Sequence, residues 1–303
     1  MKKMLVALSA LLAAALCLDA AAQPGRFDAV QIKTTKLSAN IYMLEGEGGN
    51  IGVSAGEDGV FLIDDQFAPL TDRILAAIKA ISGKPVRFIL NTHWHFDHTG
   101  GNENHGKAGV VIIAQDNVRK RLTVRQMIDY FKKSYGPMPP SALPVITFAD
   151  TVTFHMNGDV ATTFHAPHAH TDGDVIVHFR NANIVHMGDV YFSFMYPFVD
   201  VGTGGSVKGM IAATDRVLRM TDDNTKIIPG HGPLSNKREL AAYRDMLAKV
   251  SGRIEQLIKS GKNLQQVITA QPTHEFDAVW GNGFLKPDQF VEVVYTSLAP
   301  RKK

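Results

Sequence analysis

Residues 92–102 constrain the fold most strongly, because three imidazoles and a carboxylate fall within six consecutive positions after a predicted strand. In extended backbone, His93 and His95 point the same way, so both can reach one metal ion. A turn after His95 directs Asp97 and His98 towards a neighbouring position. The spacing therefore predicts two adjacent metal ions at the end of a strand.

Three later segments each place a ligand-type residue just after an apolar strand: His170, Asp189 and His231. Loops at the ends of strands are where functional sites are commonly built. His165 and His168 lie in the same stretch as His170 and remain alternatives to it. A lone histidine is more often packed or exposed than a ligand, and we apply that interpretation to His105, His155, His178 and His274.

The first 22 residues have the pattern of a cleavable signal peptide: two lysines, an apolar stretch and three small residues. We therefore expect a periplasmic or secreted protein. The apolar stretch is too short to span a bilayer comfortably, so no stable membrane anchor is expected. The only cysteine, Cys17, lies in this segment, so a mature chain from Gln23 must bind metal through nitrogen and oxygen.

The order of predicted elements indicates an α/β fold. Short apolar and β-branched runs predict strands, and apolar residues at helical spacing predict helices. The strands are expected at residues 41–44, 50–54, 60–63, 86–91, 110–114, 152–156, 160–164, 175–179, 184–187 and 226–228. The helices are expected at residues 69–81, 117–131, 207–220 and 237–259. This order predicts two packed sheets with outer helices, in one domain over residues 23–303 with a helical C-terminal part.

The charge of the chain bears on its partners. A net charge of +3 arises from 32 basic and 29 acidic residues that are interspersed along the chain. Because no block of basic residues is present, we expect no nucleic-acid partner and infer a small-molecule substrate. The sequence predicts no particular oligomeric state.

The seven ligand-type residues resemble the metal-binding pattern of the metallo-β-lactamase superfamily, His-x-His-x-Asp-His followed by a His, an Asp and a His. The resemblance implies an αβ/βα sandwich of two mixed β-sheets with helices on the outer faces, and two zinc ions (Zn2+) per chain. The first zinc would lie on His93, His95 and His170 and the second on Asp97, His98 and His231, with Asp189 bridging. Asp64 resembles the aspartate that supports the metal loops in this family, and Asp65 is a weaker candidate for that role.

The predicted chemistry is hydrolysis by a metal-bound hydroxide, because zinc lowers the pKa of its water from near 16 to about 7. Asp97 is the predicted catalytic residue, which orients the hydroxide and passes a proton to the leaving group. For an exported enzyme we expect a cyclic amide or ester, such as a β-lactam or a lactone. Familiar β-lactamases lack an aspartate at the position of Asp189, which argues against a dedicated β-lactamase.

Three other interpretations remain open: a thioester hydrolase of glyoxalase II type, an iron-dependent persulfide dioxygenase, and a non-catalytic metal-binding protein. Metal identity separates the second from the others. Aromatic residues near the predicted ligands are expected either to form an apolar wall of the substrate pocket or to belong to the core. They are Phe67, Trp94, Tyr191, Phe192, Phe194 and Tyr196.

Overall fold

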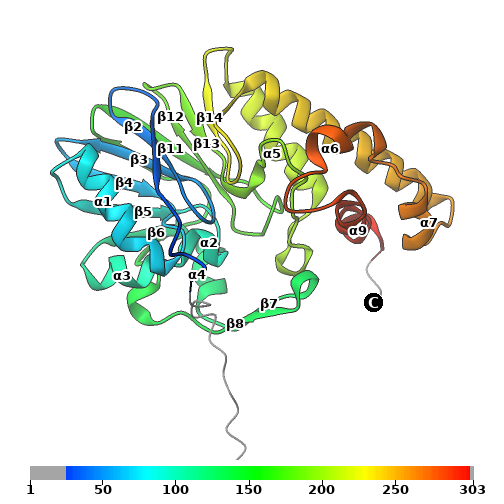
Figure 1. Cartoon of the computed structure of the whole chain (residues 1–303), viewed down its shortest axis with the longest axis horizontal. Helices are drawn as coiled ribbons and strands as arrows, with labels where there is room; N and C mark the ends of the chain where they lie inside the picture. The colour runs from blue at the N-terminus through cyan, green and yellow to red at the C-terminus, as the bar shows by residue number, and fades with distance from the viewer. Residues whose placement is uncertain (1–24, 301–303) are drawn as a thin grey trace, which may run out of the picture.

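The computed structural model describes residues 25–300, and the predicted signal peptide, residues 1–22, lies outside them. Two large sheets pack against each other (Figure 1). The first has the order β1-β2-β3-β4-β5-β6-β9 and the second β10-β11-β12-β13-β14-β15. Both are mixed, because β4, β5, β6 and β9 run parallel in the first sheet and β13 and β14 do so in the second.

The bounds of the strands follow the predicted runs closely. The first sheet contains β1 (Lys33–Lys36), β2 (Ile41–Glu45), β3 (Ile51–Gly56), β4 (Gly59–Ile63), β5 (Val86–Asn91), β6 (Val111–Gln115) and β9 (Ile146–Phe148). The second contains β10 (Thr153–Met156), β11 (Asp159–His165), β12 (Val175–Phe179), β13 (Ile184–His186), β14 (Lys226–Ile228) and β15 (Ser235–Asn236). The short strands β1, β9 and β15 have no counterpart among the predicted ones.

Strand β4 shows why its sequence suits the middle of a layered structure. Successive side chains of a strand point to opposite faces. Phe61 and Ile63 pack in the core between the sheets, where they join Val177 of β12. Val60 and Leu62 face the other way, into the cluster beneath the first helix. Every residue of β4 is therefore buried, as expected for a strand covered on both faces.

Helices cover the outer faces of both sheets (Figure 1). Helix α1 packs on the first sheet through Ile74 and Ile78, and α5 and α6 pack on the second. These layers confirm the predicted αβ/βα sandwich. The helices of these layers and of the loops between them are α1 (Thr71–Ile81), α2 (Phe96–Thr99), α3 (Asn102–Lys107), α4 (Asp116–Leu122), α5 (Val207–Met220) and α6 (Lys237–Lys259).

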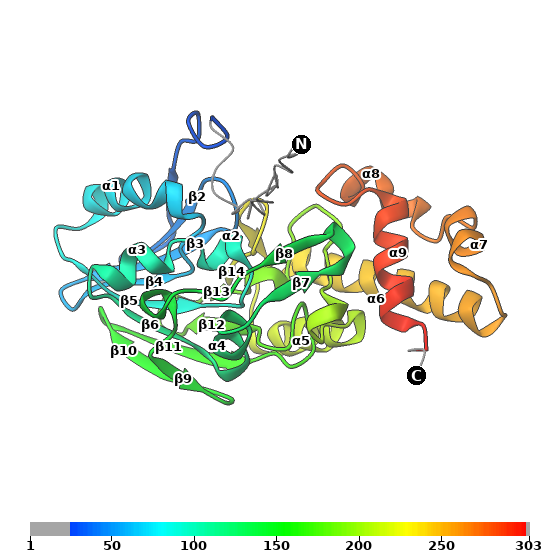
Figure 2. The same cartoon turned by 90° about the horizontal axis from the view of Figure 1, so that it is seen from below.

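The C-terminal part is helical, and it continues the outer layer of the second sheet (Figure 2). Asn236 caps α6 by accepting a hydrogen bond from Glu239 N at 3.1 Å. The last helices, α7 (Leu264–Thr269), α8 (Asp277–Trp280) and α9 (Pro287–Leu298), follow α6. Phe290 and Val294 of α9 join the same buried cluster as Leu247 of α6. Within residues 25–300, no helix is both long and apolar enough to cross a membrane.

The prediction of a helix over residues 117–131 is correct only as far as Leu122 and wrong for the residues after it. Helix α4 ends at Leu122, whose carbonyl accepts a hydrogen bond from Met138 N at 2.8 Å. The β-branched residues Thr123 and Val124 follow, and such residues lose side-chain freedom in a helix. The chain then forms an antiparallel hairpin of β7 (Gln126–Ile128) and β8 (Lys133–Tyr135). This hairpin lies near the C-terminal helices (Figure 2).

Candidate metal centre

The seven predicted ligands converge where strands of the two sheets end. His93 and His95 follow β5, while Asp97 and His98 lie on α2. The other three follow strands of the second sheet: His170 in the loop before β12, Asp189 directly after β13, and His231 after β14. A site built on the ends of several strands is held by the rigid parts of the fold.

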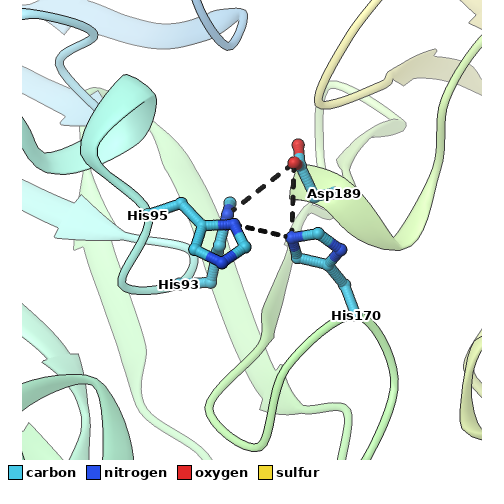
Figure 3. Close-up of side chains that lie close together, drawn as sticks. All are labelled: His93, His95, His170 and Asp189. Carbon is cyan, nitrogen blue, oxygen red and sulfur yellow. Dashed lines mark hydrogen bonds and ion pairs between the residues drawn. The ribbon is translucent and has the colours of Figure 1, made fainter. Parts of the chain in front are cut away.

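Four of these residues form a first group (Figure 3). His170 Nε2 lies 2.9 Å from His95 Nδ1 and 3.5 Å from Asp189 Oδ2. His93 Nε2 lies 3.7 Å from the same carboxylate oxygen. The ligand atoms of the group all lie within 4.8 Å of one another. One metal ion can therefore be reached by three nitrogens and one oxygen.

A second group contains Asp97, His98 and His231. His231 Nε2 lies 3.2 Å from Asp97 Oδ2 and 3.3 Å from His98 Nε2. The other oxygen of Asp189, Oδ1, faces this group at 3.1 Å from His98 Nε2 and 3.4 Å from His231 Nε2. Since the two oxygens of Asp189 face different groups, this carboxylate has the arrangement of a bridge.

Unsatisfied buried atoms show that metal ions fit the two groups. His93 Nε2 and Asp189 Oδ1 are buried without a hydrogen-bond partner among residues 25–300, although such atoms are normally paired. His170 Nε2 and His95 Nδ1 face each other at 2.9 Å, and their rings both have a partner on the other nitrogen. Five imidazoles and two carboxylates are also the nitrogen and oxygen donors that zinc binds in proteins.

Asp64 bonds to one histidine from behind the two groups. It is fully buried, and its Oδ2 accepts a hydrogen bond from His98 Nδ1 at 2.8 Å. Thr92 donates to the same side chain through its backbone N and its Oγ1, each at 2.7 Å. Since His98 Nδ1 carries the hydrogen, its Nε2 presents a lone pair to the metal group. Asp65 instead accepts from Gly101 N at 2.9 Å and holds no histidine.

Asp200 plays the same part for the first group, and the sequence does not predict it. Its Oδ2 lies 3.1 Å from His95 Nε2, so this nitrogen donates and Nδ1 is left to face the metal group. Thr203 Oγ1 donates to the same oxygen at 2.7 Å. His170 is oriented similarly, because its Nδ1 donates to the carbonyl of Phe198 at 2.9 Å. No motif marks Asp200, which stands between two valines outside every predicted element.

The pKa values describe the charge that the protein alone supplies. Burial lowers the pKa of His170 to about 4, so this ring stays neutral. Burial acts in the same direction on His231, but the carboxylates of Asp189 and Asp97 outweigh it and raise its pKa to about 9. The two carboxylates thus stabilise positive charge beside them, which is where a divalent ion would add it.

The remaining predicted residues take different positions. His165 Nε2 bonds to the carbonyl of Asp172, and His168 is exposed, so neither alternative to His170 joins the two groups. Among residues 25–300, the histidines interpreted as structural also lie outside both groups. Phe192 stacks on His231 with ring centroids 5.2 Å apart, and Phe194 is exposed to solvent.

Three of the predicted wall residues belong to the core, and Phe67 lies beside the second group. Trp94, Tyr191 and Tyr196 are fully buried. Their polar atoms bond to neighbours within the fold, namely Thr203, Ser235 and Asp277 respectively. Phe67 is half-buried and packs on Phe27, with Gly48 separating it from Asp97. Among the predicted aromatics that are not wholly buried, Phe192 contacts His231 and Phe67 lies near Asp97, whereas buried Trp94 packs on His95 from the core with ring centroids 4.5 Å apart.

The fold and the two groups together define a protein of the αβ/βα sandwich class with a buried cluster of His and Asp side chains that could hold metal. Residues 35–231 match the family model of the metallo-beta-lactamase superfamily. Because this match covers more than half of the chain, the protein belongs to that superfamily.

Two curated relatives are similar to part of the chain. The hydroxyacylglutathione hydrolase of Pelagibacter ubique (strain HTCC1062) is 29% identical over 157 residues, which are 51% of this chain and 56% of the relative. The enzyme of the same name from Erythrobacter litoralis (strain HTCC2594) is 29% identical over 112 residues, 37% of this chain and 36% of the relative. The chain thus spans about half the length of the first relative and about a third of the second.

Solved structures share the fold at lower identity. A metallo-beta-lactamase from Pontibacter korlensis has a TM-score of 0.59 and 21% identity, covering 72% of this chain and 99% of that one. The inverting sec-alkylsulfatase Pisa1 from Pseudomonas sp. has a TM-score of 0.66 and 17% identity, covering 88% of this chain and 50% of that one. At these identities the likeness shows the fold alone.

Replacing Asp200 with alanine is expected to weaken zinc binding by about 10- to 100-fold, because His95 loses the partner that sets its tautomer and orientation. Competition with a chromophoric chelator measures this affinity. Asp245→Ala is the matched control, since Asp245 is exposed and, among residues 25–300, its only ion pair is with Arg244. Equal zinc affinities in the two variants would show that Asp200 does not support the centre.

Proposed function

We propose that this chain is an exported zinc hydrolase that binds two zinc ions and cleaves esters, lactones or thioesters. The observation that carries the proposal is the orientation of Asp189, whose two oxygens face separate ligand groups. Export rests on the signal-peptide pattern of residues 1–22. The sequence predicts a cyclic amide or ester as the substrate, and the proposal keeps the ester from that prediction. β-Lactams, which are the cyclic amides, remain a substrate to be tested.

A thioester is the second candidate substrate, and a specific observation favours it. Both curated relatives are named hydroxyacylglutathione hydrolases, although each is similar to only part of this chain. The two substrate types differ in the leaving group and share the acyl carbonyl. The same constellation of side chains therefore serves either reaction.

The residues that would hold the ions divide as the two groups do. The first ion would lie on His93, His95, His170 and Asp189, and the second on Asp97, His98, His231 and Asp189. When bound, zinc supplies a water of pKa about 7 and polarises the substrate oxygen. Asp64 and Asp200 keep the rings of His98 and His95 oriented throughout the reaction.

Asp97 is placed to move a proton. Its side chain is 29% exposed and that of His231 is 23% exposed, whereas the other five ligands are nearly inaccessible. The open side of the centre therefore lies at these two residues. Burial would raise the pKa of Asp97, but His98 and His231 outweigh it and hold the pKa well below its usual range. The carboxylate is thus ionised, and the proton-transfer role that we propose for it rests on its position at the open side of the centre.

Metal content and a substrate panel test the proposal directly. We expect the chain from Gln23 to bind two zinc ions and to hydrolyse a lactone, an aryl ester or a thioester, with any β-lactam turnover weaker. Metal analysis and initial rates with each substrate measure this. One iron per chain with no hydrolysis would favour the persulfide dioxygenase, and two zinc ions without turnover of any substrate would favour a non-catalytic protein.

Asp97→Asn is expected to reduce kcat by about 10²- to 10⁴-fold, the range of a lost acid–base residue. The amide keeps one oxygen for the metal, so zinc affinity should fall much less than turnover. Parallel measurement of kcat and zinc stoichiometry distinguishes the two effects. If both fall together, Asp97 acts only as a ligand.

A further inference from the structure

Three phenylalanine rings form a continuous row that leads away from the metal centre. Phe198 packs on Phe131 with ring centroids 4.8 Å apart, and Phe131 packs on Phe284 at 5.3 Å. Tyr130 flanks the row, 5.7 Å from Phe198. These spacings are those of direct aromatic contact. We call Phe198, Phe131 and Phe284 the aromatic row.

The inner end of the row contacts the first ligand group. The ring of Phe198 lies 5.9 Å from that of His170 and 6.3 Å from that of His95. Its carbonyl also accepts the hydrogen bond from His170 Nδ1 at 2.9 Å. Phe198 is therefore part of the structure that positions the centre, and the row begins beside two of the predicted ligands.

Exposure increases along the row. Phe198 is 6% exposed, Phe131 is half-buried and Phe284 is 59% exposed. The outer rings do not complete a closed core, since more than half of the surface of Phe284 is open to solvent. Because Phe284 continues a row of packed rings, its open face offers apolar surface to a ligand.

The row is assembled from segments far apart in the chain. Phe131 lies in the hairpin between β7 and β8, Phe198 in the loop after β13, and Phe284 between α8 and α9. The hairpin and the C-terminal helices lie near each other in Figure 2. Both Phe131 and Phe284 are loop residues on a rigid scaffold, which is the usual location of residues that bind substrate.

We propose that the aromatic row binds an uncharged apolar group of the substrate, such as an acyl chain, and thereby determines which substrates are cleaved. This inference rests on the proposed hydrolase activity and names the substrate class of that same site. The three side chains carry no hydrogen-bonding or charged group, so they recognise their ligand by apolar contact alone. Because the row starts beside His170 and His95, its occupant is an apolar part of a substrate bound against the first ligand group.

A series of p-nitrophenyl esters tests the proposal in the zinc-loaded chain. From acetate through butanoate to octanoate, kcat/KM should rise by at least tenfold, since each buried methylene contributes up to about a three- to fourfold gain. Phe284→Ala should reduce the preference for octanoate over butanoate at least fivefold. Phe131→Ala should also reduce the preference for butanoate over acetate.

Ile146→Ala is the matched control, because Ile146 is an exposed apolar residue on β9 at the edge of the first sheet. It should keep the wild-type preference. Phe284→Ala removes a mostly exposed ring, so the variant should fold. A chain-length preference that is absent in the wild type, or unchanged in both phenylalanine variants, would overturn the proposal.

A binding measurement separates this inference from the hydrolase activity. Calorimetric titration of the metal-free chain with 1-octanol and 1-butanol requires neither zinc nor turnover. We expect octanol to bind at least fivefold more tightly than butanol, with the difference lost in Phe284→Ala. If the alcohols bind as expected while no ester is cleaved, the proposed activity fails and the apolar site stands.

If esters are cleaved but the alcohols do not bind, the apolar group of the substrate lies outside the aromatic row. Ester hydrolysis without any chain-length effect overturns the apolar site and leaves the hydrolase activity standing. Light scattering measures whether a second copy of the chain binds to the aromatic row. A dimer that Phe284→Ala dissociates, with the ester preference unchanged, would identify the row as an interface and contradict the proposal.

Discussion

The centre depends on the contacts of the Asp189 carboxylate with the histidines on both sides of it. This carboxylate is buried between two sets of histidines, with one oxygen 3.5 Å from His170 Nε2 and the other 3.1 Å from His98 Nε2. Burying so many ionisable groups is unfavourable unless opposite charges lie beside them. Asp64 and Asp200 add further carboxylates around the two groups. Asp64 bonds to Nδ1 of His98, and Asp200 bonds to Nε2 of His95. The two sheets supply the strand ends that bring these groups together.

The parts of the structure that the sequence predicts are those that depend on local pattern. The ligands from His93 to His98 are contiguous, and strands such as β4 and β5 have apolar runs of the right length. The layered fold follows from the order of these elements and from the superfamily resemblance. Asp64 is predicted by the superfamily resemblance, which matches its place directly after the strand β4.

The parts that the sequence does not predict depend on distant contacts. Asp200 becomes a partner of His95 only through folding, since 105 positions separate them. The aromatic row likewise joins rings that no sequence motif connects. The helix expected beyond Leu122 fails because the hairpin that follows pairs with itself, and this pairing outweighs a helical apolar pattern. Burial also decides the role of Trp94, which packs in the core beneath the centre.

A crystal structure of the zinc-loaded chain with anomalous diffraction at the zinc absorption edge tests the bridging role of Asp189 most directly. The account predicts two zinc peaks, one among His93, His95 and His170 and the other among Asp97, His98 and His231. Each peak should have a different oxygen of Asp189 as a ligand. A single peak, or two peaks of which one lies out of reach of Asp189, would contradict it.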